Sequence, residues 1–224
     1  MALKYSMTSE ATVRGVKILV YSEAGVGKTV LCSTLPKPLI ISAEAGLLSL
    51  RRHSIPVLEI KTIEDLQDAY TFCTTSAEAK NFDSLCLDSL SEMAEVVLAN
   101  AKRQVKDPRQ AYGELLDKMA MVVRSFRDTP DKHVYMSAKM EPYKDELTGI
   151  IRYGPAMPGQ KLGPQLPYFF DEVFRLGIGK TQDGSLFRFL QTQPDLQYVA
   201  KDRSGCLAPV EPPDLSVVIN KIRQ

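Results

Sequence analysis

The sequence lacks the patterns that mark several common kinds of site. It has only four cysteines in 224 residues, and no two of them form a Cys-x-x-Cys pair. No histidine pair lies near them either, so we expect no zinc site. Cys32 and Cys86 stand in apolar runs, as small buried thiols usually do. This usage of cysteine favours a reducing compartment, and we expect a cytoplasmic protein.

Net charge and long apolar segments are also scarce. The chain carries 28 Lys and Arg against 27 Asp and Glu, a formal charge of +1. Overall charge therefore gives no argument for nucleic acid, and any such site must be a local patch. The longest apolar runs are far below the ~20 residues of a membrane span, so we expect no membrane partner. Residues 1–15 are polar, so we expect no signal peptide.

Strand-like and helix-like segments alternate through the first two-thirds of the chain. Their order implies a parallel sheet with right-handed crossovers, in an α/β fold. The length fits one domain, 1–224, with residues 1–14 as a flexible or subunit-contacting arm. Thr62 is an expected N-cap. The expected strands are 16–21, 39–42, 57–60, 84–88 and 133–138, and the expected helices are 27–35, 63–73, 90–103 and 112–126.

The last third follows a different pattern. Residues 139–167 are rich in proline and glycine, and we expect a long connection there, which is usually functional or mobile. Strand-like segments follow at 172–178, 186–192 and 197–200. Asp183-Gly184 predicts a hairpin turn between the first two of them. Asp214 can cap a final helix ending near Ile222. Antiparallel strands should therefore extend one edge of the sheet.

The most specific motif lies between the first strand and the first helix. A glycine turn followed by Gly-Lys-Thr and a helix is the arrangement that binds phosphate through backbone amides. Lys28 would reach the β- and γ-phosphates of ATP, and Gly25 and Gly27 would let the backbone curl closely. Ser22 replaces the first glycine of the usual pattern. The alternative is a chance glycine-rich turn. The expected nucleotide contacts are Ser22, Glu23, Ala24, Gly25, Val26, Gly27, Lys28, Thr29 and Val30.

Two acids are candidates for the rest of the site. Asp88 ends an apolar strand and, with the Thr29 hydroxyl, would hold Mg²⁺. The competing interpretation is that Asp88 only caps the following helix. Glu44 follows the strand after the first helix. If that strand lies beside the first strand, the Glu44 carboxylate can polarise the attacking water. Otherwise Glu44 is an ordinary solvated acid.

Several segments together carry a resemblance to a known family. Residues 40–45 resemble the segment of RecA-fold ATPases that holds their catalytic glutamate, and 85–89 resemble their Walker B strand. Residues 200–205 resemble the lysine-x-arginine finger of RecA-fold helicases of the DnaB type. The order of motifs, from about Val16 to Ile222, is similar to that of small RecA-like phage ATPases. That family of phage nucleotide-binding proteins includes single-strand annealing recombinases of the Sak type.

The resemblance implies a P-loop NTPase with a RecA-like core, ATP and Mg²⁺ as cofactors, and ATP hydrolysis. Lys201 and Arg203 would act on the nucleotide of a neighbouring subunit. A homo-oligomer, either a ring or a filament, would then hold nucleotide at its interfaces. Without the resemblance, both residues would belong to a solvated turn. The resemblance also implies a γ-phosphate sensor at the end of the fifth strand. Either Lys139 serves as this sensor, or the sensor is absent.

Single-stranded DNA is the partner that the resemblance implies. Its binding loop would span Lys139 to Pro164, where Tyr143 and Tyr153 offer base stacking. The alternative is a mobile lid or a subunit contact. The charged residues of this loop are Lys139, Glu141, Lys144, Asp145, Glu146, Arg152 and Lys161. A second basic run is either a solvated face or a contact to DNA phosphates, and it comprises Lys102, Arg103, Lys106 and Arg109.

Three functions remain open from the sequence. The first is a DNA-stimulated ATPase in recombination, annealing or replication. The second is a small-molecule kinase, which shares the cradle but would need an acceptor pocket. The third is a switch that hydrolyses slowly. A GTPase is disfavoured because no Asn-Lys-x-Asp motif occurs, and a transporter ATPase because no Leu-Ser-Gly-Gly signature occurs.

Overall fold

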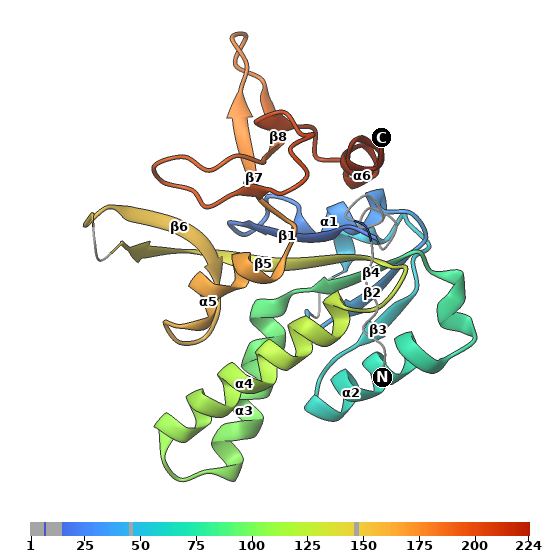
Figure 1. Ribbon diagram of the computed structural model, residues 1–224, viewed down its shortest axis with the longest axis vertical. Helices are drawn as coiled ribbons and strands as arrows, with labels where there is room; N and C mark the ends of the chain where they lie inside the picture. Colours follow the sequence, from blue (N-terminus) through green and yellow to red (C-terminus); the bar gives the residue numbers. More distant parts are fainter. Residues whose placement is uncertain (1–6, 8–14, 45–46, 146–147) are drawn as a thin grey trace.

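A ten-stranded mixed sheet organises the molecule (Figure 1). The computed structural model describes residues 7, 15–44, 47–145 and 148–224. The expected arm at 1–14, apart from residue 7, therefore lies outside the described residues. The same is true of Ala45 and Glu146, which belong to the expected motifs. The main strand order is β10-β8-β7-β1-β5-β4-β2-β3. The central part, from β7 to β3, is parallel, as the alternation of segments predicts. Its strands are β1 (Lys17–Ser22), β2 (Pro38–Ser42), β3 (Val57–Glu59), β4 (Ser84–Asp88), β5 (His133–Lys144) and β7 (Glu172–Lys180).

Antiparallel strands extend this sheet, as expected for the last third of the chain. Strand β8 (Leu186–Gln191) pairs with β7, and β10 (Val210–Glu211) pairs with β8. The short strand β9 (Lys201–Asp202) also pairs with β7. The turn at Asp183 and Gly184 closes the β7–β8 hairpin, because Thr181 N donates to Ser185 O. The predicted α/β fold, with a mainly parallel sheet that antiparallel strands extend near the C-terminus, is confirmed.

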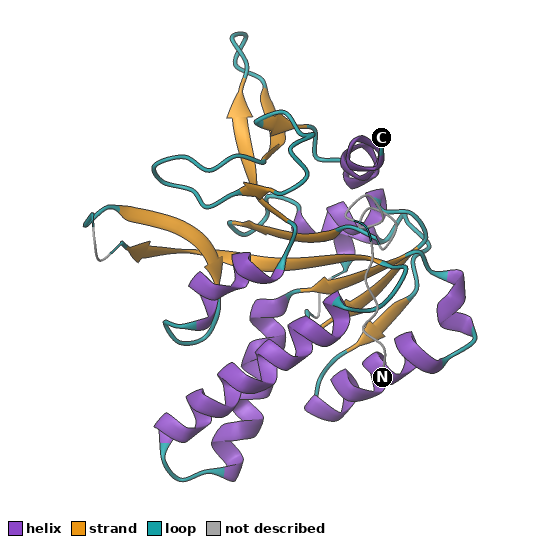
Figure 2. Ribbon diagram, viewed as in Figure 1, coloured by secondary structure: helices purple, strands orange, loops and turns teal. Residues whose placement is uncertain are grey.

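Helices cover both faces of the parallel strands (Figure 2). One face packs against α2 (Ile63–Thr75), α3 (Leu90–Gln104) and α4 (Pro108–Arg127). The other packs against α1 (Lys28–Leu31), the 3₁₀ helix Cys32–Thr34 and α6 (Leu215–Arg223). The short helix α5 (Leu162–Gln165) follows the strand β6 (Ile151–Ala156). Further 3₁₀ turns lie at Leu48–Leu50, Glu78–Asn81 and Leu166–Phe169.

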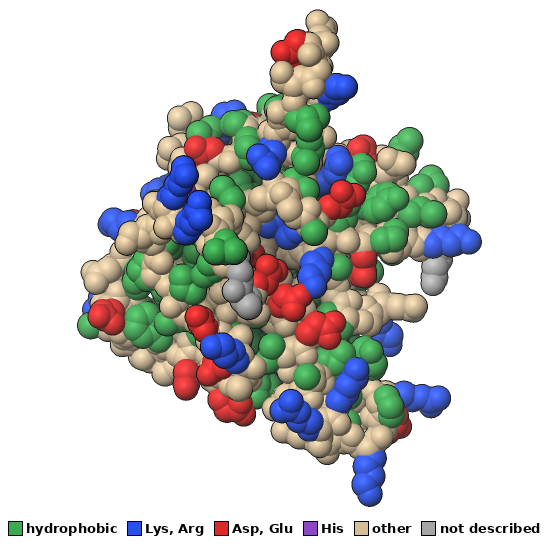
Figure 3. All heavy atoms as spheres, turned by 180° about the vertical axis from the view of Figure 1, so that it is seen from behind, with side chains coloured by type: hydrophobic (Ala, Val, Ile, Leu, Met, Phe, Trp, Pro, Cys, Tyr) green, Lys and Arg blue, Asp and Glu red, His purple; other side chains and the backbone are tan. Residues whose placement is uncertain are grey.

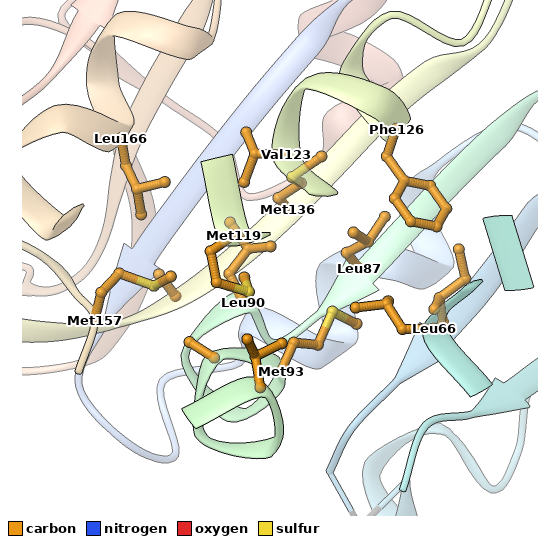
Figure 4. Packing of buried hydrophobic residues seen from close by; sticks show 14 of the residues in the cluster. Leu66, Leu87, Leu90, Met93, Met119, Val123, Phe126, Met136, Met157 and Leu166 are labelled. Carbon is orange, nitrogen blue, oxygen red and sulfur yellow. The ribbon is translucent and has the colours of Figure 1, made fainter. Parts of the chain in front are cut away.

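The core divides according to the alternation of side chains along each strand. Leu19 and Tyr21 of β1 face α2, α3 and α4, whereas Ile18 and Val20 face α1 and α6. Met93, Met119 and Phe126 close the first of these layers over β4 and β5 (Figure 4). Each such buried side chain contributes roughly 1.5–3 kcal/mol relative to exposure. Strands that are buried on both faces explain why the sequence shows continuous apolar runs.

Most predicted boundaries agree with the structure. Thr62 caps α2 in a capping box with Asp65, and Asp214 accepts from Ser216 N and Val217 N at the start of α6. The helix predicted for 27–35 is instead a four-residue α-helix followed by a 3₁₀ turn. The 3₁₀ turn ends at Thr34, because Pro36 disfavours helical backbone in Leu35, which is extended.

Two predictions, one of a connection and one of a strand, are wrong. Residues 139–167 do not form one long loop, because β5 continues to Lys144 and pairs antiparallel with β6. Edge position makes this hairpin compatible with proline, and Pro142 lies opposite Tyr153. No strand spans 197–200, where Tyr198 makes a single bridge to Tyr153 and β9 begins only at Lys201. Among the described residues, no helix is both long and apolar enough to cross a membrane.

Candidate functional site

The glycine turn after β1 has the backbone shape that a phosphate cradle requires. Gly25 has φ +75° and Gly27 has φ +119°, which are left-handed values that side chains disfavour. An added Cβ at Gly25 would meet nothing within 4 Å, so conformation and not crowding requires glycine there. The turn leads directly into α1, where Leu31 N donates to Gly27 O. Ser22 keeps a negative φ, and its hydroxyl donates to Glu23 O, so serine fits the position where the usual pattern has glycine.

Lys28 lies folded over the turn that it follows. Its Nζ donates to Ser22 O at 3.1 Å, Ser22 Oγ at 3.2 Å and Glu23 O at 3.0 Å. Burial lowers the pKa of Lys28, and the carboxylates of Glu44 and Asp88 oppose that shift. The ammonium is therefore held between two acids and the backbone carbonyls of the cradle.

Thr29 and Asp88 meet although 59 positions separate them. The Thr29 hydroxyl donates to Asp88 Oδ2 at 2.6 Å, and Ser137 donates to the other oxygen, Oδ1. Asp88 does not cap the next helix, because Ser89 is the N-cap of α3 and accepts from Glu92 N. The capping interpretation of Asp88 is thus wrong. Its buried carboxylate instead joins the end of β4 and the interior of β5 to α1.

Glu44 reaches the same place by a different route from the expected one. Strand β2 does not lie beside β1, because β5 and β4 stand between them. The expectation that the strand before Glu44 lies beside β1 is therefore wrong. However, Ser42 is in register with Asp88, and the Glu44 carboxylate accepts from Ser89 Oγ at 2.8 Å. This contact across the end of β4 places Glu44 next to the acid that binds Thr29.

A cavity of about 1100 Å³ lies beside the cradle. Glu44, Lys28 and Thr29 line it together with the turn itself. Lys139 also lines it and pairs with Glu92 at the start of α3, which raises the pKa of Lys139. The residue suggested as a γ-phosphate sensor thus lies in the wall of this cavity. The space matches the volume of a cofactor site.

Two residues that sequence reasoning missed hold the cradle in place. Arg188 of β8 donates from Nε to Val26 O at 2.6 Å and lines the cavity. Tyr135 of β5 is buried and donates from its hydroxyl to Lys28 O at 2.8 Å. Neither residue has a local sequence signal, because only the order of the strands brings it to the turn.

Lys201 and Arg203 lie away from this cavity. Strand β9 pairs with Glu172 and Val173 at the start of β7, whereas the cradle follows the end of β1, which runs parallel to β7. Lys201 Nζ donates to Pro167 O and Phe170 O, and Arg203 pairs with Asp171 at 2.8 Å. The side chain of Arg203 is 60% exposed. Neither residue can act on the nucleotide of its own chain, and two interpretations remain, a solvated turn and action on a neighbouring subunit.

The donors around the cradle fit a magnesium nucleotide. Mg²⁺ is usually bound through one or two carboxylates, water and the phosphates of the substrate, not through an all-protein cage. Thr29 and Asp88 supply a hydroxyl and a carboxylate of that kind. Within 15–44, 47–145 and 148–224, no group of three or more His, Cys, Asp or Glu forms a separate metal site. Thr29 and Asp88 are therefore the residues that would hold the ion.

The turn after β1, the helix that follows it and the acid at the end of β4 define the chain as a P-loop nucleotide-binding protein. Residues 14–204 match the AAA domain family, so the chain belongs to this family of P-loop ATPases. A similar solved structure is the KaiC-like protein PH0186 of the hyperthermophilic archaeon Pyrococcus horikoshii OT3. It is 15% identical, with 79% of this chain and 77% of that chain covered and a TM-score of 0.46. No curated protein matches the chain.

Proposed function

We propose that this P-loop ATPase binds ATP with Mg²⁺ and hydrolyses it in an oligomer that acts on single-stranded DNA. The observation that carries the hydrolytic part is the convergence of Lys28, Thr29 and Glu44 on one cavity, with Asp88 bonded to Thr29 behind its wall. These residues come from the cradle and from the ends of β4 and β2. Three separate segments of sequence therefore supply a cation, a metal-binding pair and a free carboxylate oxygen at one place.

Each of these side chains has a distinct role in the proposal. Lys28 exchanges its bonds to Ser22 and Glu23 for the phosphate oxygens of ATP, and so neutralises their charge. Asp88, fixed by Ser137 and Thr29, orients the water shell of the metal. Glu44 accepts the proton of the attacking water at its carboxylate, which Ser89 holds in position. Magnesium, when bound, supplies charge neutralisation at the phosphates.

The oligomer supplies what one chain lacks. The cavity has Lys28 and Lys139, but Lys139 is paired with Glu92, and Arg188 is directed at the carbonyl of Val26. Charge that develops on the transferred phosphoryl group is typically stabilised by a further arginine. Arg203 lies at the end of the parallel strands opposite to the cradle and is exposed, as a residue that serves a head-to-tail neighbour would be. We propose that Arg203, with Lys201 beside it, completes the site of the next subunit.

The DNA-directed role rests on the order of motifs that resembles phage RecA-like ATPases of the Sak type. The test is the rate of phosphate release from ATP, with and without single-stranded DNA. We expect hydrolysis that requires Mg²⁺ and rises when DNA is added. Phosphate transferred to a metabolite would identify a kinase instead. Hydrolysis that DNA leaves unchanged would leave the ATPase in place and remove the DNA-directed role.

A further inference from the structure

A basic surface lies at the far end of the α3–α4 hairpin. It comprises the cations Lys102, Arg103, Lys106, Arg109 and Lys161, and the ring of Tyr112; we name it the α3–α4 surface. All six side chains are exposed. Figure 3 shows Lys and Arg side chains gathered at this end of the molecule, while acidic side chains gather nearer the middle of the face.

The described residues neutralise little of the positive charge of this surface. In the part of the chain that the structure describes, none of the five cations forms an ion pair. The only carboxylate between Lys102 and Tyr112 is Asp107, which caps α4 by accepting from Arg109 N. Five cations with so little compensation form a local anion-attracting patch in a chain whose formal charge is only +1.

The patch also contains an apolar groove. A hollow of about 370 Å³ is lined by Tyr112 and Leu116 of α4 and by the loop at Pro158, together with Arg109 and Lys161. Tyr112 is 42% exposed, and the Lys102 ammonium lies 5.6 Å from the centre of its ring. The backbone at Gly159 passes so close that an added Cβ would come within 3.2 Å of this ring. The Tyr112 ring thus packs against the backbone at Gly159 on one side, and the rest of the ring is accessible and has cations around it.

Cations around an exposed aromatic ring match the chemistry of a single-stranded nucleic acid, with charged phosphates and bases that stack. The β5–β6 hairpin, expected from the sequence to bind DNA, matches it less well. Arg152 of this hairpin lies 3.9 Å from Asp145 and donates to Asp195 O, and the ring of Tyr153 stacks on Tyr198 at 5.3 Å. Its arginine and one of its two candidate stacking rings are therefore already engaged inside the chain.

We propose that the α3–α4 surface is the binding site for single-stranded nucleic acid, an inference that rests on the DNA-directed part of the proposed function. Both segments that carry the surface are anchored at the ATP site. Helix α3 follows its N-cap Ser89, which is bonded to Glu44, and ends ~22 Å away at the basic patch. The loop before Lys161 is held by Ser91, which donates to Ala156 O and accepts from Lys139 N. Binding of a nucleic-acid strand at the α3–α4 surface therefore acts on Glu44 and Lys139, which line the ATP cavity.

The test measures fluorescence anisotropy of a labelled oligothymidylate with the full chain and two charge-reversal variants. K102E/R109E changes the α3–α4 surface. K61E/K80E makes the same change in charge at two exposed lysines beside β3 and after α2. We expect the first to bind roughly tenfold or more weakly, with a salt dependence lower by about 1.4 in log–log slope, and the second to bind like wild type. Thermal unfolding checks that both variants fold.

Further measurements separate the possible failures. Tyr112→Leu should weaken binding and Tyr112→Phe should not, because only the ring stacks. The K102E/R109E variant should keep its basal ATPase rate and lose stimulation by DNA. If wild type binds DNA and K102E/R109E binds equally well, the surface is wrong and the proposed function stands. If wild type hydrolyses ATP but binds no DNA, both DNA proposals fail. Equal binding of polyglutamate, insensitive to Tyr112→Leu, would show a docking site for an acidic protein and overturn the proposal.

Discussion

The Thr29 hydroxyl donates a 2.6 Å hydrogen bond to Asp88 Oδ2, and this bond ties the start of α1 to the end of β4. Strand β5 stands between β1 and β4, and its Ser137 binds the second oxygen of Asp88. A hydroxyl and a carboxylate at this distance can share one Mg²⁺ only if the strands β1, β5 and β4 stay in register. The site therefore depends on sheet order as much as on the residues themselves.

Loss of the Thr29 hydroxyl should raise the magnesium requirement. We expect Thr29→Val to need at least about tenfold more Mg²⁺ for half-maximal ATP hydrolysis, because one metal ligand is gone. Thr29→Ser keeps the hydroxyl and should behave like wild type. The measurement is the ATPase rate over a Mg²⁺ titration. Identical titrations for Thr29→Val and wild type would place the metal elsewhere.

Glu44→Gln should separate ATP binding from hydrolysis. The amide cannot accept the proton of the attacking water, so turnover should fall roughly 10²–10⁴-fold while nucleotide affinity is kept. Affinity is measured with a fluorescent ATP analogue, and turnover by phosphate release. The control is Glu59→Gln, which changes an exposed acid at the end of β3 and should leave both affinity and turnover unchanged. Normal hydrolysis by Glu44→Gln would assign the base to another residue.

Arg203→Ala should abolish turnover in a way that a second subunit can repair. Removal of an arginine that acts on the transferred phosphoryl group typically costs about 10³–10⁵ in rate. Lys28→Ala has the opposite defect, an intact arginine and a damaged cradle. Mixing the two inactive variants should restore part of the activity, because some interfaces then combine an intact cradle with an intact arginine. Mixtures that stay inactive, with both variants still assembled, would contradict action between subunits.

Arg188→Gln should weaken nucleotide binding through the cradle. The Arg188 contact to Val26 O contributes about 1–3 kcal/mol as a hydrogen bond from a charged group, and we expect roughly tenfold weaker ATP affinity. Lys180→Gln, an exposed cation at the end of β7, serves as control. Calorimetric titration with ATP measures both variants. Unchanged affinity in Arg188→Gln would show that the turn keeps its shape without this contact.

Glu172, which lies beside the proposed intersubunit turn, should make the free energy of unfolding depend on pH. Burial, reinforced by the neighbouring charge of Asp202, raises the pKa of Glu172 to about 8. A raised pKa in the folded state means that its stabilising contribution is fully present below about 4.5 and is lost as pH rises through about 8. The charges of Asp171, Lys201 and Arg203 surround the same turn.

Glu172→Gln keeps the shape of the protonated acid and cannot ionise. Its free energy of unfolding should equal that of wild type at pH ~4 and exceed it by more than about 1 kcal/mol at pH ~9. Lys17, whose pKa burial lowers to about 8, titrates in both proteins and cancels in the comparison. Urea unfolding across this range measures the difference. Parallel pH profiles would show that Glu172 is ionised and solvated in the folded protein.

Local signals predicted most elements, because each depends on neighbours in sequence. Thr62 and Asp214 cap their helices through bonds that span two or three residues, and β4 ends at Asp88 as its apolar run predicts. The hairpin of β5 and β6 escaped prediction, since its pairing depends on register between segments that are rich in proline and glycine. Residues 197–200 have strand-like composition, yet no neighbouring strand offers them a continuous partner.

The amino-acid sequence by itself determined the cradle, because left-handed φ values at Gly25 and Gly27 and the adjacent Lys28 are properties of a few consecutive residues. Only the tertiary structure decided what surrounds it. The strand order brought Asp88 to Thr29, let Glu44 reach the site across β4, and carried Arg188 to Val26 from 162 positions away. Such contacts follow from sheet order and register, which arise from burial of the whole core and leave no trace in any short segment.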